Sequence, residues 1–369
     1  MMFVLERRAS PSFTMAIASP ILAALGMIAT GFLLFSALGK DPVEVFYLFF
    51  IKPLSTTYDI GELLLKTTPL LLCGLGLAMG FRANVWNIGA EGQLTMGAIA
   101  GGGVALWFGD SDSVFAMPLM LLAGVLGGMI WAAIPAFLRT RFNTNEILVT
   151  LMLVYIAQLL LSWLVHGALR DPEGQNYPQS RGFGDAETMS VLIEGTRVTW
   201  GIVYAVGLAI ISWIVSQKTI AGFRMQVAGV APAAAAYAGF SEKRNIWIAL
   251  LVCGATAGLA GICEVAGPIG RLQQTISPGY GFAAIIVAWI GRLNPIGVVF
   301  GALLMALLYL GGESAQMGMS LPSAITGLFQ GLLLFYLLAA DLFITFRLRR
   351  VRPVKQVEVK PAVTLGSAA

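Results

Sequence analysis

Five polar side chains crowd one short stretch of an otherwise apolar sequence, FRANVWNIGAEGQ at 81–93. They are Arg82, Asn84, Asn87, Glu91 and Gln93. Amides and a carboxylate at this spacing could hydrogen-bond a polar solute, and Trp86 could stack on a flat ring. Gly89 and Gly92 weaken a helix, which favours an interrupted helix beside a polar cavity. An interfacial turn whose polar groups satisfy free backbone ends explains the pattern equally well.

A second polar and glycine-rich cluster lies in the later half of the chain, CEVAGPIGRLQQTISPGYGFAAIIVAWIGRLNPIG at 263–297. It falls about 190 residues after the first cluster, and Pro278-Gly279 interrupts it before a short apolar helix. Similarly broken regions in corresponding halves are typical of internally duplicated transporters.

The elements that must position these residues are membrane-spanning helices. The chain has 369 residues, of which 57% are hydrophobic and only 11% charged, less than half the charged fraction of a typical soluble domain. Apolar runs near the length of a bilayer crossing recur throughout. The sequence therefore predicts an all-α polytopic membrane protein with about ten transmembrane helices, some broken or re-entrant. They are expected at 15–38, 62–80, 88–108, 115–138, 145–166, 199–216, 246–267, 280–291, 296–312 and 322–345.

The lysines and arginines predict the orientation of these helices. If the N-terminus is cytoplasmic, sixteen of the 23 basic residues fall in inside segments and six in outside segments, as the positive-inside rule requires. The net charge of +4 is thus explained by membrane topology, and no nucleic-acid partner is expected. Both termini are predicted to be cytoplasmic.

Charge and loop length also define the predicted domain organisation. A cytoplasmic N-terminus (1–14) and a cytoplasmic basic tail (347–369) flank a transmembrane domain (15–346). The domain carries an external loop at 167–198 and a cytoplasmic loop at 217–245. The tail is expected to be disordered beyond Pro353.

The cytoplasmic loop contains an alanine-rich segment, APAAAAYAGF at 231–240. Alanine favours helix, Pro232 suits a first helical turn, and Gly239 can end the helix in a left-handed conformation. A helix this short is marginal by itself, so another surface is expected to pack on it. That surface could be the protein's own membrane domain or another protein.

Several kinds of chemistry lack their motifs. The sequence contains no P-loop, no zinc-type H-E-x-x-H, no G-x-S-x-G and no Cys/His cluster. Cys73, Cys253 and Cys263 lie in apolar runs without metal-ligand spacing, and His166 has no partner acid or nucleophile at a meaningful spacing. No metal, cofactor or intrinsic enzymatic activity is expected, which leaves a transporter, a channel or a membrane scaffold.

Five segments together resemble the permease subunits of bacterial ABC importers for nucleosides and simple sugars. More narrowly, they resemble the larger permease of basic-membrane-protein-type nucleoside importers. The segments are GFRANVWNIGAEGQLTMGA (80–98), TNEILVTLMLVYIA (144–157), LRDP (169–172), AGFRMQVAGVAPAAAAYAGF (221–240) and ISPGYGFAAIIVAWIGRLNPIG (276–297). The resemblance extends over about residues 60–345.

The resemblance implies a multi-pass protein of the bacterial inner membrane, working with several partners. These would be a cytoplasmic ABC ATPase, a second homologous permease forming a heterodimer, and an extracytoplasmic substrate-binding lipoprotein. The ATPase-coupling helix would comprise Ala231, Pro232, Ala233, Ala234, Ala235, Ala236, Tyr237, Ala238 and Gly239. The translocation path would be lined by Asn84, Trp86, Asn87, Glu91, Gln93, Gln273, Gln274, Ser277 and Tyr280.

The sequence departs from the family pattern at Val154 and Ala231, where asparagine is frequent, and is less polar at 233 and 236. Val154 would remove a hydrogen-bonding group from the path, and the alanine run would make the coupling surface smoother. Two other functions fit the residues: an ion-coupled secondary transporter with Glu91 or Glu264 as coupling acid, and a non-transporting scaffold. A simple sugar is the alternative substrate to a nucleoside.

Overall fold

The computed structural model describes residues 2–8, 13–109, 112–174 and 176–351. The chain divides into two compact units. The larger comprises Thr30–Leu332, and the smaller combines Met1–Ala29 with Leu333–Ala369. The predicted disorder beyond Pro353 falls outside the described residues.

The smaller unit holds a two-stranded antiparallel ribbon that the sequence analysis did not predict. Strands β1 (Met2–Arg7) and β2 (Phe346–Val351) pair along their whole length. Glu6 lies opposite Arg347, and their side chains form an ion pair at 2.9 Å. The first part of α1 (Phe13–Ala37) and the last part of α13 (Ala324–Thr345) belong to the same unit.

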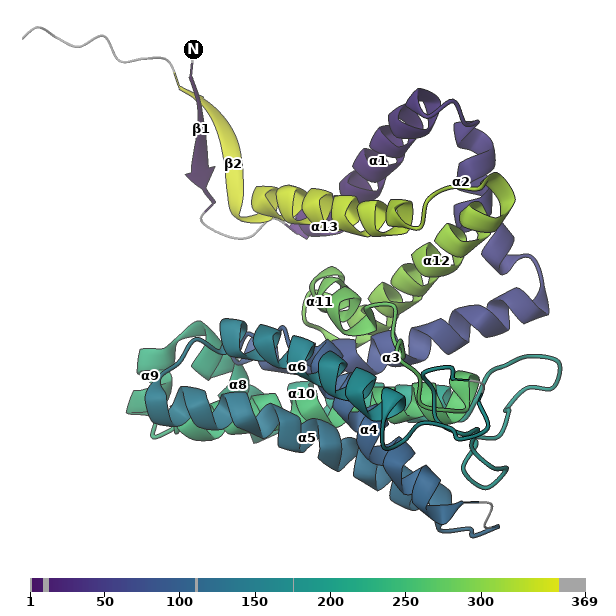
Figure 1. Cartoon of the computed structure of the whole chain (residues 1–369). Helices are drawn as coiled ribbons and strands as arrows, with labels where there is room; N and C mark the ends of the chain where they lie inside the picture. The colour runs from purple at the N-terminus through teal and green to yellow at the C-terminus, as the bar shows by residue number, and fades with distance from the viewer. Residues whose placement is uncertain (1, 9–12, 110–111, 175, 352–369) are drawn as a thin grey trace, which may run out of the picture. The chain divides into compact units, whose positions relative to one another are not determined.

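The larger unit is built from helices and their connections (Figure 1). After α1 these are α2 (Pro42–Phe50), α3 (Thr57–Arg82), α4 (Ala90–Phe108), α5 (Ala116–Phe142), α6 (Glu146–His166), α7 (Gly201–Lys218), α8 (Ile220–Val230), α9 (Pro232–Tyr237), α10 (Glu242–Glu264), α11 (Tyr280–Ile290) and α12 (Pro295–Met319). The described residues of this unit also include a 3-10 turn at Lys52–Leu54 and a π-helical turn at Val265–Ile269.

These helices confirm the predicted all-α polytopic membrane protein. Among the described residues, six helices are long and apolar enough to cross a bilayer: α3, α5, α6, α7, α10 with its π-helical turn, and α12. Three shorter apolar stretches lie at Ile21–Ala37, Tyr280–Ile290 and Gly327–Ala340. With 11 residues, α11 is about 16 Å long and cannot cross a hydrocarbon core of about 30 Å.

The helix ends follow local sequence signals. Asn145 caps α6 by accepting a hydrogen bond from the Ile147 amide, and Asn294 caps α12 in the same way with Pro295 at its first position. The sequence did not predict α2 and α8, which have only 9 and 11 residues. The prediction also ended α12 at 312, whereas the helix continues to Met319 and Glu313 pairs with Lys66 of α3 at 2.8 Å.

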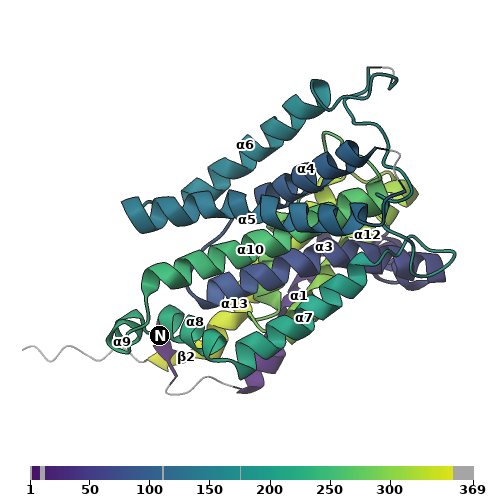
Figure 2. The same ribbon diagram turned by 90° about the horizontal axis from the view of Figure 1, so that it is seen from below.

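Glycines allow α4, α5 and α10 to pack backbone against backbone. Figure 2 shows α5, α10 and α3 side by side. A Cβ added to Gly97 of α4 would lie 2.7 Å from the carbonyl carbon of Gly258, and one added to Gly128 of α5 would lie 2.8 Å from the Gly258 Cα. Gly124 and Gly128, like Gly254 and Gly258, are four residues apart, the small-residue spacing that favours close helix contact in membranes. The glycine spacing is visible in the sequence, whereas the helix that each glycine contacts is not.

Candidate functional site

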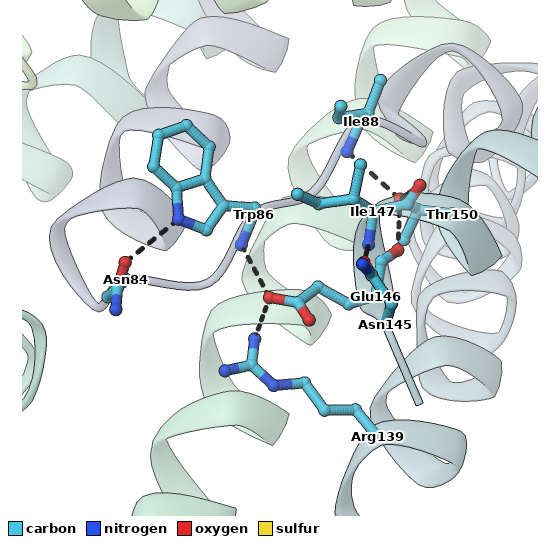
Figure 3. A network of polar contacts seen from close by, with 8 residues as sticks. All are labelled: Asn84, Trp86, Ile88, Arg139, Asn145, Glu146, Ile147 and Thr150. Carbon is cyan, nitrogen blue, oxygen red and sulfur yellow. Dashed lines mark hydrogen bonds and ion pairs between the residues drawn. The ribbon is translucent and has the colours of Figure 1, made fainter. Parts of the chain in front are cut away.

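The first polar cluster forms a break between two helices. α3 ends at Arg82 and α4 begins at Ala90, and the seven residues 83–89 between them are not helical. Asn84 adopts the left-handed conformation with φ 55°, which asparagine tolerates better than most residues. Its side-chain oxygen accepts a hydrogen bond from the Trp86 indole Nε1 at 3.0 Å (Figure 3). The predicted interruption is therefore present, and its first residues are ordered by their own side chains.

Asn87 and Gln93 are used within this turn. Both are buried. The Asn87 amide Nδ2 donates to Gln93 Oε1 at 2.9 Å, and Asn87 Oδ1 accepts from the Gly89 backbone amide at 2.9 Å. The second bond satisfies a backbone N–H at the start of α4 that has no partner within the helix. Asn87 and Gln93 therefore fit the second interpretation, a turn whose polar side chains satisfy its own backbone, rather than a solute contact.

Side chains of α6, one of them paired with α5, contact this turn, an arrangement that the sequence analysis did not predict. Glu146, the first residue of α6, accepts a hydrogen bond from the Trp86 backbone amide at 3.4 Å and forms an ion pair with Arg139 of α5. Thr150 Oγ1 accepts from the Ile88 amide at 3.2 Å (Figure 3). The α5–α6 connection therefore fixes the turn from outside. No spacing rule links residues 86 and 146, so this contact could not be predicted.

Glu91 joins the two broken regions. Its side chain is 3% exposed, and Oε2 accepts a hydrogen bond from the Gly281 amide at 2.6 Å. Ser277 Oγ accepts hydrogen bonds from the neighbouring Gly279 and Tyr280 amides at 3.1 and 2.8 Å. Because Gly281 lies in the first turn of α11, the carboxylate faces the positive end of that helix. A Cβ on Gly281 would lie 2.5 Å from the Glu91 Cα, so the two helix starts cross in backbone contact.

Next to this crossing is a cavity of about 440 Å³ between α4, α6 and residues 274–277. A volume of this order is typical of small-molecule sites. The polar groups on its wall come from Glu91, Thr95, Tyr155, Gln158, Ser162, Gln274, Thr275 and Ser277. Carboxylate, amide and hydroxyl groups together can donate to and accept from a neutral polar solute. The cavity could therefore hold such a solute by hydrogen bonds.

The nine residues expected to line one path lie in several places. Glu91, Gln274 and Ser277 line the cavity, whereas Asn84, Asn87 and Gln93 belong to the turn. Trp86 stacks on Trp289 with ring centres 5.8 Å apart, and Gln273 donates to the Thr275 carbonyl at 2.9 Å. Tyr280 is buried and lines a smaller cavity of about 140 Å³ that also touches Glu62, Lys66, Arg197 and Glu264.

Sequence reasoning missed the contribution of α6 to the cavity. Tyr155, Gln158 and Ser162 are spaced by three and four residues, so they form one stripe on a helix. A search for polar stripes in apolar helices would have found them. Val154 does not face the cavity: it is buried, and a Cβ on Gly92 would lie 2.9 Å from its Cα. The departure from the family pattern at this position thus falls at the packing of α6 on α4.

The alanine-rich segment forms the short helix α9 as predicted, with Pro232 in its first turn and Gly239 at φ 78° after its end. Ala235 is buried, with 4% exposure, whereas the other residues of 231–239 are exposed. Tyr237 is 97% exposed and Val230, just before α9, is 80% exposed. α9 thus rests on the protein through one alanine and presents an aromatic side chain outward.

The chain is similar to known transport proteins over most of its length. Residues 60–338 match the family described as the branched-chain amino acid transport system permease component. The chain is 36% identical to a glucose ABC transporter permease protein of Haloferax volcanii, with 92% of each chain covered. It is 30% identical to a guanosine ABC transporter permease protein of Bacillus subtilis, over 86% of this chain and 91% of the relative. A second guanosine ABC transporter permease protein of that organism is 28% identical over 76% of this chain and 88% of the relative.

No solved structure matches the chain. The family match covers more than half of the sequence and includes both broken regions. Permeases of ABC transporters are transport subunits that work with an ATPase and with substrate-binding partners, so neither the ion-coupled transporter nor the scaffold is supported. The chain belongs to the branched-chain amino acid transport system family of permease components, and it is a membrane-embedded transport subunit of an ABC transporter rather than an enzyme.

Proposed function

We propose that this permease forms the path by which a nucleoside enters the cell. The observation that carries the proposal is the polar cavity of about 440 Å³ where Glu91 meets the start of α11. A nucleoside offers hydroxyl groups, ring nitrogens and exocyclic groups to the donors and acceptors on the wall. The similarity to a guanosine permease supports this class of solute.

A simple sugar is the second candidate, because the similarity to the glucose permease extends over more of the chain. Uptake of radiolabelled guanosine, adenosine and glucose should be measured in cells with and without this chain. We expect the deletion to abolish uptake of nucleosides and to leave that of glucose unchanged. Loss of glucose uptake alone would replace the nucleoside by a sugar.

The transporter is proposed to contain a second permease, a two-domain cytoplasmic ATPase and an extracytoplasmic lipoprotein. The two guanosine permeases of one organism to which this chain is similar support a heterodimer. On this proposal α8 and α9 dock on the ATPase, residues 167–198 face outward and both termini are cytoplasmic. The segment 347–351, which contains Arg347, Arg349 and Arg350, begins a cytoplasmic tail. A mild-detergent pull-down of the tagged chain from its native membrane, followed by mass spectrometry, should recover the ATPase and a second permease. Recovery of the intact chain alone would contradict this composition.

A further inference from the structure

The turn at 83–89 lies between the segment proposed to meet the ATPase and the cavity. The backbone of α8 contacts the backbone at the N-terminal end of this turn. A Cβ on Gly229 of α8 would overlap the Arg82 carbonyl oxygen and lie 3.2 Å from the Asn84 amide nitrogen. Val85 of the turn and Met225 of α8 belong to the same buried apolar cluster. A displacement of α8 and α9 must therefore press directly on the turn.

At its other end, the turn leads into the cavity wall. Gly89 precedes α4, whose second residue is Glu91. The Asn87 side chain ties the turn to Gln93, so turn and first helical turn form one hydrogen-bonded unit. A Cβ on Gly89 would lie 2.9 Å from the Thr150 Cβ, which leaves this end little room to shift independently. A displaced turn would therefore carry Glu91 with it.

Between these two ends, one carboxylate fixes the backbone. Glu146 Oε1 accepts from the Trp86 amide at 3.4 Å and pairs with Arg139, and the side chains of both partners are largely shielded, at 13% and 18% exposure. Arg139 also borders a small cavity of about 80 Å³ whose wall includes Ala235 and Ala236 of α9. The ion pair thus lies close to α9 and to the turn at once.

We propose that Glu146 is a positioning residue, which clamps the 83–89 turn so that movement of α8 and α9 reaches Glu91. The proposal rests on the proposed docking of the ATPase on α8 and α9. Without the clamp, the middle of the turn would yield when α8 presses on its start. ATP hydrolysis would then continue while solute movement falls, which is a loss of coupling rather than of assembly.

The test uses the complete transporter, with ATPase and second permease, in proteoliposomes. Solute uptake and ATP hydrolysis are measured on the same preparation, in the presence of the binding protein. Glu146→Leu has a similar size but neither charge nor acceptor. We expect its ratio of solute transported to ATP hydrolysed to fall at least fivefold, with ATP hydrolysis within twofold of wild type.

Two further variants distinguish positioning from general damage. Glu146→Gln retains an oxygen that can accept from the Trp86 amide, and we expect it to keep at least half of the wild-type ratio. Glu6→Leu breaks an exposed ion pair with Arg347, and its ratio should equal that of wild type. A wild-type ratio in Glu146→Leu, or a ratio in Glu146→Gln as low as in Glu146→Leu, overturns the proposal.

If the Glu146→Leu complex does not assemble, Arg139→Met decides. It removes the cation that holds the Glu146 carboxylate beside the Trp86 amide, so we expect at least a twofold lower ratio, and an unchanged ratio overturns the proposal. The ratio of solute transported to ATP hydrolysed tests the role of Glu146 whichever solute the transporter carries. A wild-type complex that carries glucose instead of nucleosides contradicts the proposed substrate but still allows the ratio to be measured.

Discussion

At the scale of single residues, Glu91 combines a structural and a proposed functional role. Its carboxylate holds the start of α11 through the Gly281 amide, and it also forms part of the cavity wall. A neutral amide in its place could still accept from that amide, but it would not offer a charge to the helix end or to a bound solute.

Glu91→Gln is therefore expected to lower solute uptake about tenfold, the loss of roughly 1.4 kcal/mol, because a hydrogen bond to a charged group becomes one to a neutral group. The amount of assembled transporter should remain unchanged. Uptake is measured at equal membrane levels of protein. Glu194→Gln, at an exposed position, serves as the control, and equal uptake by both variants would exclude a role of Glu91 in transport.

Asn87 illustrates what residue types alone could not decide. The sequence suggested either a solute contact or a satisfied turn, and the structure shows its side chain bonded to Gln93 and to the Gly89 amide. The choice depended on where each amide points, which the sequence does not contain. Tyr155, Gln158 and Ser162 are the opposite case, because their helical spacing was readable and only their partner surface was unknown.

At the scale of elements, the crossing of α4 and α11 requires a residue without a side chain. The Cβ of any other residue at 281 would lie 2.5 Å from the Glu91 Cα, within a backbone contact that cannot give way. The two broken regions can meet only because glycine lies at this point.

Gly281→Ala should thus destabilise the protein by about 3 kcal/mol, the upper range for overpacking. This destabilisation is measured as a shift of the thermal unfolding midpoint in detergent, with size-exclusion chromatography as the readout. Gly207→Ala on α7 is the matched control, since an added Cβ there meets no atom within 4 Å, and alanine should leave the midpoint unchanged or raise it. Equal midpoints for the two variants would contradict the tight crossing.

The short helix α9 could be predicted because alanine, an initial proline and a terminal glycine act locally. α8 could not be, because its residues, IAGFRMQVAGV, include two glycines and lack a clear amphipathic pattern. It is helical because Thr219 caps it and Met225 packs into the core. Several local signals thus identified α9, whereas α8 combines one local cap at Thr219 with tertiary packing of Met225.

Tyr237→Asp is expected to reduce the ATPase recovered with the tagged chain at least tenfold, because tyrosine is enriched among the few interface residues whose loss costs about 2 kcal/mol or more. Its thermal midpoint should not change, since the side chain is 97% exposed. Tyr177→Asp, at 69% exposure in the 167–198 loop, is the matched control. Ala235→Asp is a poorer test, because it would also bury a charge. Normal ATPase recovery with Tyr237→Asp would contradict docking at α9.

At the scale of the whole molecule, the class and most helix positions were predictable, since apolar runs and charge bias are properties of the sequence itself. The ribbon of β1 and β2 was not, because it pairs segments more than 330 residues apart. The folded arrangement of α4, α5 and α10 was likewise unpredicted, although its glycine spacing was visible.

The proposed topology predicts opposite labelling of two introduced cysteines. The native Cys73, Cys253 and Cys263 are buried, so a membrane-impermeant maleimide should give little background. We expect Tyr177→Cys to react in intact cells and Arg141→Cys, at an exposed position near the proposed cytoplasmic end of α5, to react only after the membrane is opened. The reverse pattern would invert the assigned orientation.

The glycine contacts among α4, α5 and α10 also constrain when the protein can fold during its synthesis. α10 begins at Glu242, one hundred residues after α5 ends at Phe142. At translation rates of about 5–20 residues per second, that interval lasts roughly 5–20 s. Throughout it, the glycine surface of α5 that later receives Gly254 and Gly258 has no partner from this chain. Ribosome-bound chains that stop before α10 therefore present an incomplete helix bundle to the insertion and quality-control machinery of the membrane.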